Sequence, residues 1–212
     1  MFKKFINHEK GITGLETAII LIAFVVVAAV FAYTALSAGL FSTQKGQEAV
    51  YSGLKEAQST LELRGAVVAT AGVVGDEDTG TVKLISFIVS NVLNGEPIDF
   101  TEPTDNGTTG VAASGGNNKV VINYIDQNQT INNLYWTVTK LGNANANFLL
   151  ESGEKFKITV GDVSVGGTLL DALTPDLTAN GRFSLVIQTP VGAVLEIERT
   201  IPAYVDTIMN LR

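Results

Sequence analysis

Cysteine is absent from the 212-residue chain, and histidine occurs once, at His8. Without cysteine the protein has no disulfide framework, no thiolate nucleophile and no cysteine-ligated metal. His8 lies in a short basic segment at the N-terminus, and removal of that segment would also exclude histidine-based catalytic triads and zinc sites. Aspartate and glutamate are plentiful, but no spacing singles out a catalytic pair of carboxylates. We therefore predict no catalytic residue, no metal site and no cofactor.

Basic residues are few, with 14 lysines and arginines against 21 aspartates and glutamates, a net charge of −7 and a pI near 4.7. Without the first eleven residues, 11 basic and 20 acidic residues remain. Nucleic acid is not an expected partner, because phosphates need a basic surface. Such a balance is typical of an exposed, mutually repulsive, soluble surface.

Charge is missing altogether between Glu16 and Lys45. The centre of this interval, residues 17–36, reads TAIILIAFVVVAAVFAYTAL. As a helix these residues would extend roughly 30 Å, the thickness of the hydrocarbon core of a bilayer. The lysines that precede the interval favour an orientation with the N-terminus inside the cell. The pattern predicts a helix that inserts into the membrane.

Beyond this interval the pattern becomes amphipathic, with Val50, Leu54, Ala57 and Leu61 at i, i+4, i+7 and i+11. Gly65 follows where a left-handed helix cap would sit. These signals predict one helix over residues 12–64, about 80 Å long. A domain of this size cannot enclose so long a rod, so we expect the helix to pack against neighbouring molecules.

The rest of the chain is rich in Gly, Thr, Asn, Val and Ile, and its short alternating runs end in turn signals. The predicted fold class is therefore α+β: a long N-terminal hydrophobic helix followed by an immunoglobulin-like β-sandwich or barrel over residues 65–212. The predicted strands cover residues 65–74, 81–89, 119–124, 135–141, 154–160, 182–189 and 193–199.

Several processing routes fit a basic segment followed by an apolar helix. A secretory signal would be cut after the apolar run, and Ala35-Leu36-Ser37 offers such a site, with Ala38 as the first mature residue. Against this, the amphipathic helix continues without a turn across that position. A simple signal anchor is the second route. Neither accounts for Glu16 at the edge of the apolar stretch, where a buried carboxylate needs a partner.

Lys10-Gly11 followed by ITGLETAIILIAFVVVAAVFA resembles the class III signal of archaellins (archaeal flagellins) and type IV pilins. The resemblance implies that a membrane prepilin/prearchaellin peptidase cuts between Gly11 and Ile12, so that residues 1–11 are a leader peptide. Gly14 and Glu16 would then be the third and fifth mature residues. The glutamate at that place is held in these families to pair with the new N-terminal amine, which is physically sound in apolar surroundings.

A second resemblance lies at the C-terminal end. Residues 183–211, FSLVIQTPVGAVLEIERTIPAYVDTIMNL, are similar to the archaellin signature of a Pro-x-Gly-Ala hairpin that leads into a strand and an Arg-Thr-Ile-Pro stretch. This segment favours an archaellin over a generic pilin. Taken by itself, it is also consistent with an edge hairpin in which Pro202 ends a strand.

These resemblances imply a structural subunit of the archaellum filament: a helical homopolymer on the cell surface, rotated by a membrane motor-platform complex. The precursor would lie in the cytoplasmic membrane. One alternative is an archaeal type IV adhesion pilin, which shares leader and helix but serves attachment. A second is a membrane-anchored surface β-domain that binds a ligand.

Small residues recur every seven positions along the predicted helix, at Ala32, Gly39, Gly46 and Gly53. Such a set drifts only about 20° per repeat on a straight helix and predicts a shallow groove where neighbouring helices approach closely. Alternatively, each glycine merely loosens or kinks the helix.

Two further patterns concern the predicted β domain. Asn106-Gly107-Thr108 and Asn128-Gln129-Thr130 are N-glycosylation sequons, which makes Asn106 and Asn128 candidate modification sites. The acidic residues of 76–78, with Asp99, Glu102 and Asp105, could offer oxygen ligands to Ca²⁺. Their spacing matches no calcium-binding loop, so solvated turns are the favoured interpretation.

Overall fold

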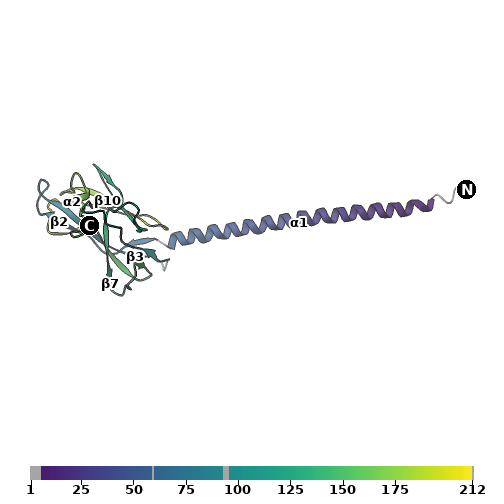
Figure 1. Cartoon of the computed structure of the whole chain (residues 1–212), viewed down its shortest axis with the longest axis horizontal. Coiled ribbons are helices and arrows are strands. Elements are labelled where there is room, and N and C mark those ends of the chain that lie inside the picture. Colours follow the sequence, from purple (N-terminus) through teal and green to yellow (C-terminus); the bar gives the residue numbers. More distant parts are fainter. Residues whose placement is uncertain (1–5, 59, 93–95, 212) are drawn as a thin grey trace. The chain divides into compact units, whose positions relative to one another are not determined.

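A computed structural model of the protein describes residues 6–58, 60–92 and 96–211. The chain forms two compact units, Met1–Ser52 and Gly53–Arg212. A helix makes up the described part of the first unit, and antiparallel β-sheets make up most of the second (Figure 1). The second unit is called the head below.

The first element, α1 (Ile6–Gln58), is a single helix of 53 residues (Figure 1). The prediction of a long N-terminal helix is confirmed, but its predicted end at residue 64 is wrong. Residues Leu61–Leu63 form strand β1, which pairs with β3 (Thr81–Asn91), and Leu61 is buried in the core of the head. The helical spacing of Leu61 was misleading because a short run of apolar residues fits the repeat of a helix and that of a strand equally well. Gly65 is left-handed, as predicted, but it follows a strand instead of capping the helix.

The larger sheet of the head is antiparallel, in the order β12-β2-β3-β9-β7, with β1 paired to β3. Its strands besides β1 and β3 are β2 (Val67–Val73), β7 (Trp136–Leu141), β9 (Lys155–Val160) and β12 (Ile208–Leu211). The long strand β3 pairs with β2 near its beginning and with β1 near its end, Val73 lying opposite Thr81 and Leu61 opposite Asn91. Strand β3 therefore extends from one end of the sheet to the other and pairs with a different strand at each end.

The smaller sheet has the order β11-β10-β5-β6 and is also antiparallel. Its strands are β5 (Val121–Asp126), β6 (Thr130–Ile131), β10 (Arg182–Gln188) and β11 (Leu195–Thr200). A separate pair joins β4 (Ile98–Asp99) to β8 (Leu149–Leu150), and α2 (Leu169–Ala172) is a single helical turn. Each of the seven predicted strands corresponds to an observed one. Prediction missed β1, β4, β6, β8, β12 and α2, which have two to four residues each and show too little periodicity to detect.

One hydrophobic core lies between the two sheets and takes alternate residues from both. The alternation is clearest in β10, where Phe183, Leu185 and Ile187 are buried and their neighbours are not. Phe100 packs edge-on against both Trp136 and Phe156, with ring centroids 5.9 Å apart in each pair. Two sheets that share one core make a β-sandwich, which confirms the predicted fold class.

Candidate assembly surface

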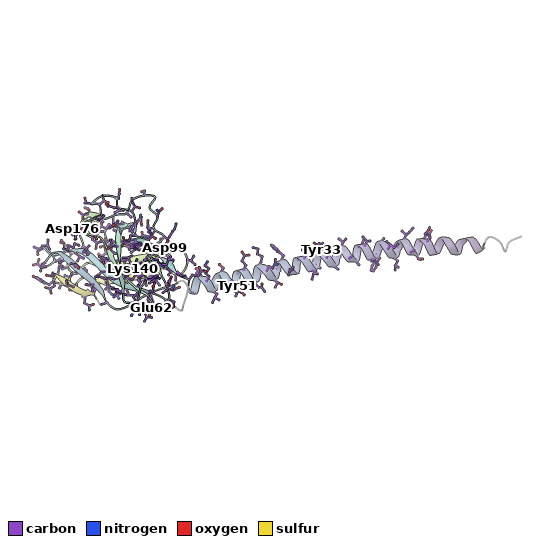
Figure 2. All side chains as sticks on the ribbon, turned by 60° about the horizontal axis from the view of Figure 1, so that its bottom comes forward. Tyr33, Tyr51, Glu62, Asp99, Lys140 and Asp176 are labelled. Carbon is purple, nitrogen blue, oxygen red and sulfur yellow. The ribbon has the colours of Figure 1, made fainter. Side chains whose placement is uncertain are left out.

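Large apolar side chains project from the central part of α1, and no described residue of the chain buries them. Fifteen of them between Leu15 and Phe41 are each more than half exposed. In Figure 2 side chains stand out all around the helix, with Tyr33 and Tyr51 labelled. The segment Gly14–Glu56 is long and apolar enough to cross a membrane, and none of it is buried within the chain. Monomeric soluble proteins rarely leave an apolar surface of this extent open to water.

The area of this apolar surface determines how much free energy its burial contributes to association. Complete burial of one such side chain stabilises by roughly 1.5–3 kcal/mol. Burial of half of the fifteen contributes on the order of 10–20 kcal/mol before the entropic cost of association. Only a bilayer or other protein molecules can provide that burial, since the described residues of the head have a core of their own.

The threonine hydroxyl groups in this apolar stretch are satisfied within the helix. The Oγ1 atoms of Thr17, Thr34 and Thr43 donate hydrogen bonds to backbone carbonyl oxygens three or four residues earlier, at 2.9–3.0 Å. A threonine bonded in this way brings no unsatisfied donor into an apolar environment. The three side chains are therefore compatible with burial of α1 in lipid or in a helix bundle.

The predicted glycine groove lies on an uninterrupted part of α1. A Cβ atom built on Gly39, Gly46 or Gly53 would meet no other atom within 4 Å, apart from the helix backbone nearby. The helix continues through all three positions, so none of them breaks it, although glycine disfavours a helix by about 1 kcal/mol relative to alanine. The groove is open in the chain by itself, and its role in contacts between subunits stays a prediction.

The predicted leader and cleavage residues lie at the beginning of α1. The backbone is helical at Lys10, Gly11 and Ile12, whose side chains fall outside the described residues. Gly14 and Glu16 are exposed on the helix. Cleavage after Gly11 and pairing of the Glu16 carboxylate with a new amine remain predictions, because both concern the processed chain.

The two sequons lie at the surface of the head, and both asparagines are exposed. Asn128 occupies the tight turn between β5 and β6, where an Asp126 carboxylate oxygen accepts the backbone N–H groups of Asn128 at 2.6 Å and Gln129 at 2.8 Å. Partial burial raises the pKa of Asp126, but these hydrogen bonds outweigh it and hold the pKa below its usual value. The carboxylate therefore stays ionised near neutral pH and fixes the turn that presents Asn128.

Two of the acidic residues considered as calcium ligands have structural roles in the head. One Asp99 carboxylate oxygen accepts the backbone N–H of Thr101 at 2.9 Å and its hydroxyl at 2.6 Å, which closes a turn. Glu102 accepts the backbone N–H of Val138 at 2.6 Å and so covers an open edge of β7. Among the described residues, no group of three or more histidine, aspartate or glutamate side chains is arranged to hold a metal.

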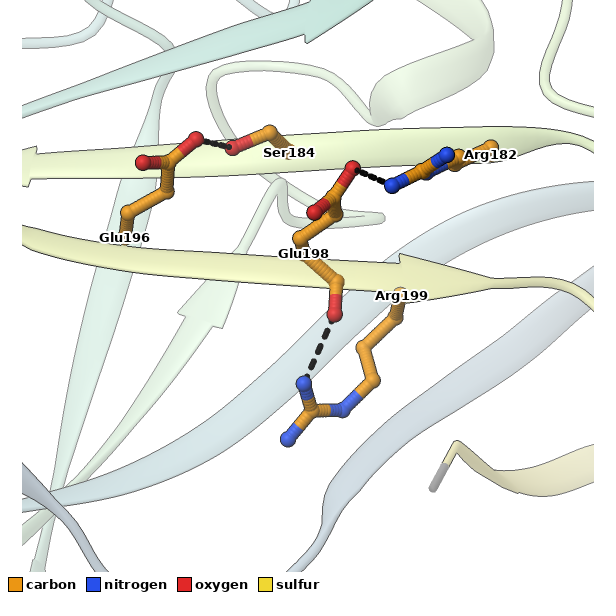
Figure 3. Close-up of polar contacts among 5 residues, drawn as sticks. All are labelled: Arg182, Ser184, Glu196, Glu198 and Arg199. Atoms are coloured by element: carbon orange, nitrogen blue, oxygen red, sulfur yellow. Dashed lines mark hydrogen bonds and ion pairs between the residues drawn. The ribbon is translucent and has the colours of Figure 1, made fainter.

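The C-terminal resemblance maps onto the β10–β11 hairpin and β12. Ile197 faces the core while Glu196 and Glu198 are exposed, as the alternation in the sequence predicts. On the outer face, drawn in Figure 3, Arg182 pairs with Glu198 at 2.6 Å and the Ser184 hydroxyl donates to Glu196 at 2.9 Å. The sequence did not indicate these partners, because they depend on the register that places Ser184 opposite Glu198.

Comparison with known proteins finds the model of the archaeal-type flagellin family over residues 11–199. The chain is 36% identical to probable flagellin 1 of Archaeoglobus fulgidus across all of this chain and 99% of that protein. It is 30% identical to probable flagellin 1 of Aeropyrum pernix across 95% of this chain and 96% of that protein. The likeness therefore includes helix and head together.

Two solved structures resemble the fold. One is the archaeal flagellum of Methanospirillum hungatei, with a TM-score of 0.61, 28% identity and coverage of 93% of this chain and 98% of that one. The other is a crystal structure of the archaeal flagellin FlaB1 of Methanocaldococcus jannaschii, with a TM-score of 0.51 and 15% identity over 72% of this chain and 96% of that one. The latter likeness supports the fold alone. With the family match over most of its length and relatives that align from end to end, the chain belongs to the archaeal-type flagellin family.

Proposed function

We propose that this protein is the structural subunit of an archaeal flagellar filament, polymerised through α1 and used for swimming. The observation that best supports this proposal is the long apolar helix, which is exposed along its described length. This helix is joined to a head that folds around its own core. Family membership and the likeness to a solved archaeal flagellum support the same conclusion. The function is mechanical: packed helices transmit torque, and we assign no catalysis to the chain.

Assembly would begin with the precursor in the cytoplasmic membrane, where lipid shelters α1. After cleavage the helix would leave the bilayer and pack among the helices of other copies. Lipid and a helix bundle are similarly apolar, so this transfer need not be steeply uphill. The partners implied are a prearchaellin peptidase, a membrane motor-platform complex and further copies of this chain, with the assembled filament outside the cell.

The first residues of the processed chain would bring two opposite charges into this apolar setting. Cleavage after Gly11 would place a positive α-amine on Ile12, four residues before the Glu16 carboxylate. An unpaired charge is costly in low dielectric, so amine and carboxylate would stabilise each other within one chain or between neighbours. Pairing of this kind would also fix the axial position of each helix.

An adhesion pilin remains the nearest alternative function, because pilins share this leader and helix. The β10–β11 hairpin and the end-to-end likeness to flagellins favour the swimming filament. A ligand-binding, membrane-anchored domain is less consistent with a helix that continues well beyond one bilayer thickness.

Deletion of the gene should give cells that no longer swim, and a plasmid copy should restore swimming. Filaments sheared from the parent strain should contain peptides of this chain by mass spectrometry, and electron microscopy should find no such filaments on the deletion strain. Deleted cells that swim normally but no longer attach to surfaces would establish the adhesion pilin instead.

Edman sequencing of the protein from sheared filaments should begin at Ile12, because the peptidase leaves the apolar helix on the mature chain. A Gly11→Val substitution should block processing, and the uncut precursor should accumulate in the membrane. Ser37→Val is the matched control at the alternative site and should leave processing unchanged. A mature protein that starts at Ala38 would contradict the proposal.

Gly46→Leu should allow insertion into the membrane but prevent polymerisation, because leucine fills the groove where a neighbouring helix approaches. Gly46→Ala is the matched control: both variants raise helix propensity by about 1 kcal/mol, but alanine adds only one methyl group. The measurement is the fraction of subunit in filaments pelleted from sheared cells. Normal filaments from Gly46→Leu would refute the groove.

Peptide mass spectrometry of the filament protein should detect a glycan on Asn128, which lies in an ordered and exposed turn. Thr130→Ala should abolish the added mass because it destroys the sequon, whereas Thr130→Ser should retain it. The same measurement covers Asn106. If the peptides that contain Asn106 and Asn128 are both unmodified, the prediction of N-glycosylation is wrong.

A further inference from the structure

The sequence holds three Asn-Gly pairs, at residues 94–95, 106–107 and 180–181. An asparagine followed by glycine is especially prone to lose its side-chain amide, because glycine has no side chain that shields its backbone nitrogen or restricts its rotation. The first pair lies outside the described residues. The other two lie in loops of the head, and in both the asparagine is exposed. Their surroundings nevertheless differ.

Loss of the amide begins with an attack by the chain on itself. The backbone nitrogen of the glycine attacks the side-chain carbonyl carbon, Cγ, of the asparagine. A new C–N bond closes a cyclic succinimide, and the side-chain nitrogen leaves as ammonia, which takes up the proton of the glycine N–H through solvent. Water then opens the ring at either carbonyl and gives aspartate or isoaspartate. The reaction needs only water, but the backbone must rotate to bring the nitrogen onto Cγ.

The second pair lies in the segment 105–109, which is anchored at its two ends. On one side the Thr104 carbonyl accepts the backbone N–H of Ala113 at 2.9 Å, and on the other the Gly110 N–H donates to the Gly166 carbonyl at 2.7 Å. Between these anchors, no backbone N–H of residues 105–109 donates a hydrogen bond within the described part of the chain. All five residues are exposed. Backbone rotation here therefore breaks no such bond.

The reacting groups of Asn106 and Gly107 are themselves unrestrained. Gly107 has a φ of +74°, in the left-handed region, and a Cβ atom built on it would meet no other atom within 4 Å. The Asn106 side chain makes no hydrogen bond to another described residue, and only its backbone carbonyl is engaged, as the acceptor of the Thr109 hydroxyl at 3.4 Å. Neither the attacking nitrogen nor the carbon that it attacks is held in place.

The third pair, Asn180 and Gly181, has the same chemistry but is held at both reacting groups. The Gly181 N–H donates to the Thr178 carbonyl at 3.2 Å, so the attacking nitrogen is engaged. The Asn180 Nδ2 donates to a Glu77 carboxylate oxygen at 3.4 Å. Packing around the glycine is close, because a Cβ atom built on it would lie 2.8 Å from the Leu177 side chain. Rotation at this pair would break a hydrogen bond and disturb the packing.

We infer that Asn106 is a site of spontaneous deamidation, whereas the fold protects Asn180. The inference goes beyond the proposed function and does not depend on it, because the reaction needs only the exposed segment 105–109. Deamidation at Asn106 is faster by roughly tenfold, the factor that corresponds to the loss of one ordinary hydrogen bond.

Deamidation of Asn106 changes the charge and the length of the chain in this segment. Burial and the charges of Glu102, Asp162 and Asp105 raise the pKa of Tyr135, so the new carboxylate enters a region that is already negative. Isoaspartate also adds a methylene group to the backbone. Both changes alter the surface that the head presents to its surroundings.

The nitrogen that is lost is also the one to which a glycan would be attached, because residues 106–108 form a sequon. The bulk of a sugar there would hinder attack on Cγ, and a deamidated residue can no longer be glycosylated. The two modifications therefore exclude one another at Asn106. The other sequon lacks this competition, since Asn128 is followed by Gln129, whose N–H donates to Asp126 at 2.8 Å.

Peptide mapping of incubated protein tests the inference. Full-length Thr108→Ala protein is used, because without the sequon the Asn106 amide stays free of glycan. It is kept folded at mildly alkaline pH, which promotes loss of the proton from the attacking nitrogen, and is then digested with trypsin. Fragment mass spectrometry should find aspartate or isoaspartate at Asn106 accumulating roughly tenfold faster than at Asn180. Labelling by an isoaspartyl methyltransferase should mark the same peptide.

Two controls accompany this measurement. Adding Gly107→Ala should slow the reaction severalfold, because a methyl group shields the nitrogen and open space is available for it. Incubation of the same protein unfolded in guanidinium should bring Asn180 to the rate of Asn106, because unfolding releases Gly181. Equal rates at the two asparagines in the folded protein would overturn the inference, as would an Asn106 that reacts only after unfolding.

Discussion

An apolar helix that its own chain leaves uncovered is the constraint on which the rest of this protein depends. Between Glu16 and Lys45 no charged side chain interrupts α1, and its threonine hydroxyls are bonded to its own backbone. Such a helix is stable in lipid or among other helices, but not when it is exposed to water. Insertion into a membrane, as proposed for the precursor, and polymerisation would both meet this one requirement.

The head meets the opposite requirement, because it has to stay soluble while attached to that helix. Its two sheets share one core, and the excess of acidic over basic residues disfavours random association between heads. Helices that slide on one another through apolar contact alone would have a poorly defined axial position. The proposed pairing of the Glu16 carboxylate with a new N-terminal amine would define that position.

Particular residues illustrate how far the sequence could predict the structure. Seven strands were predictable because each has six residues or more, and in β10 buried and less buried residues alternate from Phe183 to Ile187. The end of α1 was not, since Leu61 satisfies a helical spacing and enters the head only through the pairing of β1 with β3. Strand β12 was not predicted because its four residues, two of them buried, are too few to show a clear alternation of apolar and polar side chains.

The sequence by itself determined the long helix, the β-rich head, the absence of cysteine chemistry and the resemblance to archaeal flagellins, because each of these follows from composition or local periodicity. Only the tertiary structure decided which residues meet. It bridged Gly75 to Val205, paired Leu61 with Asn91, and joined Arg182 to Glu198 across the β10–β11 hairpin. Contacts between residues more than a hundred positions apart depend on strand register, and register is fixed by the packing of the whole core.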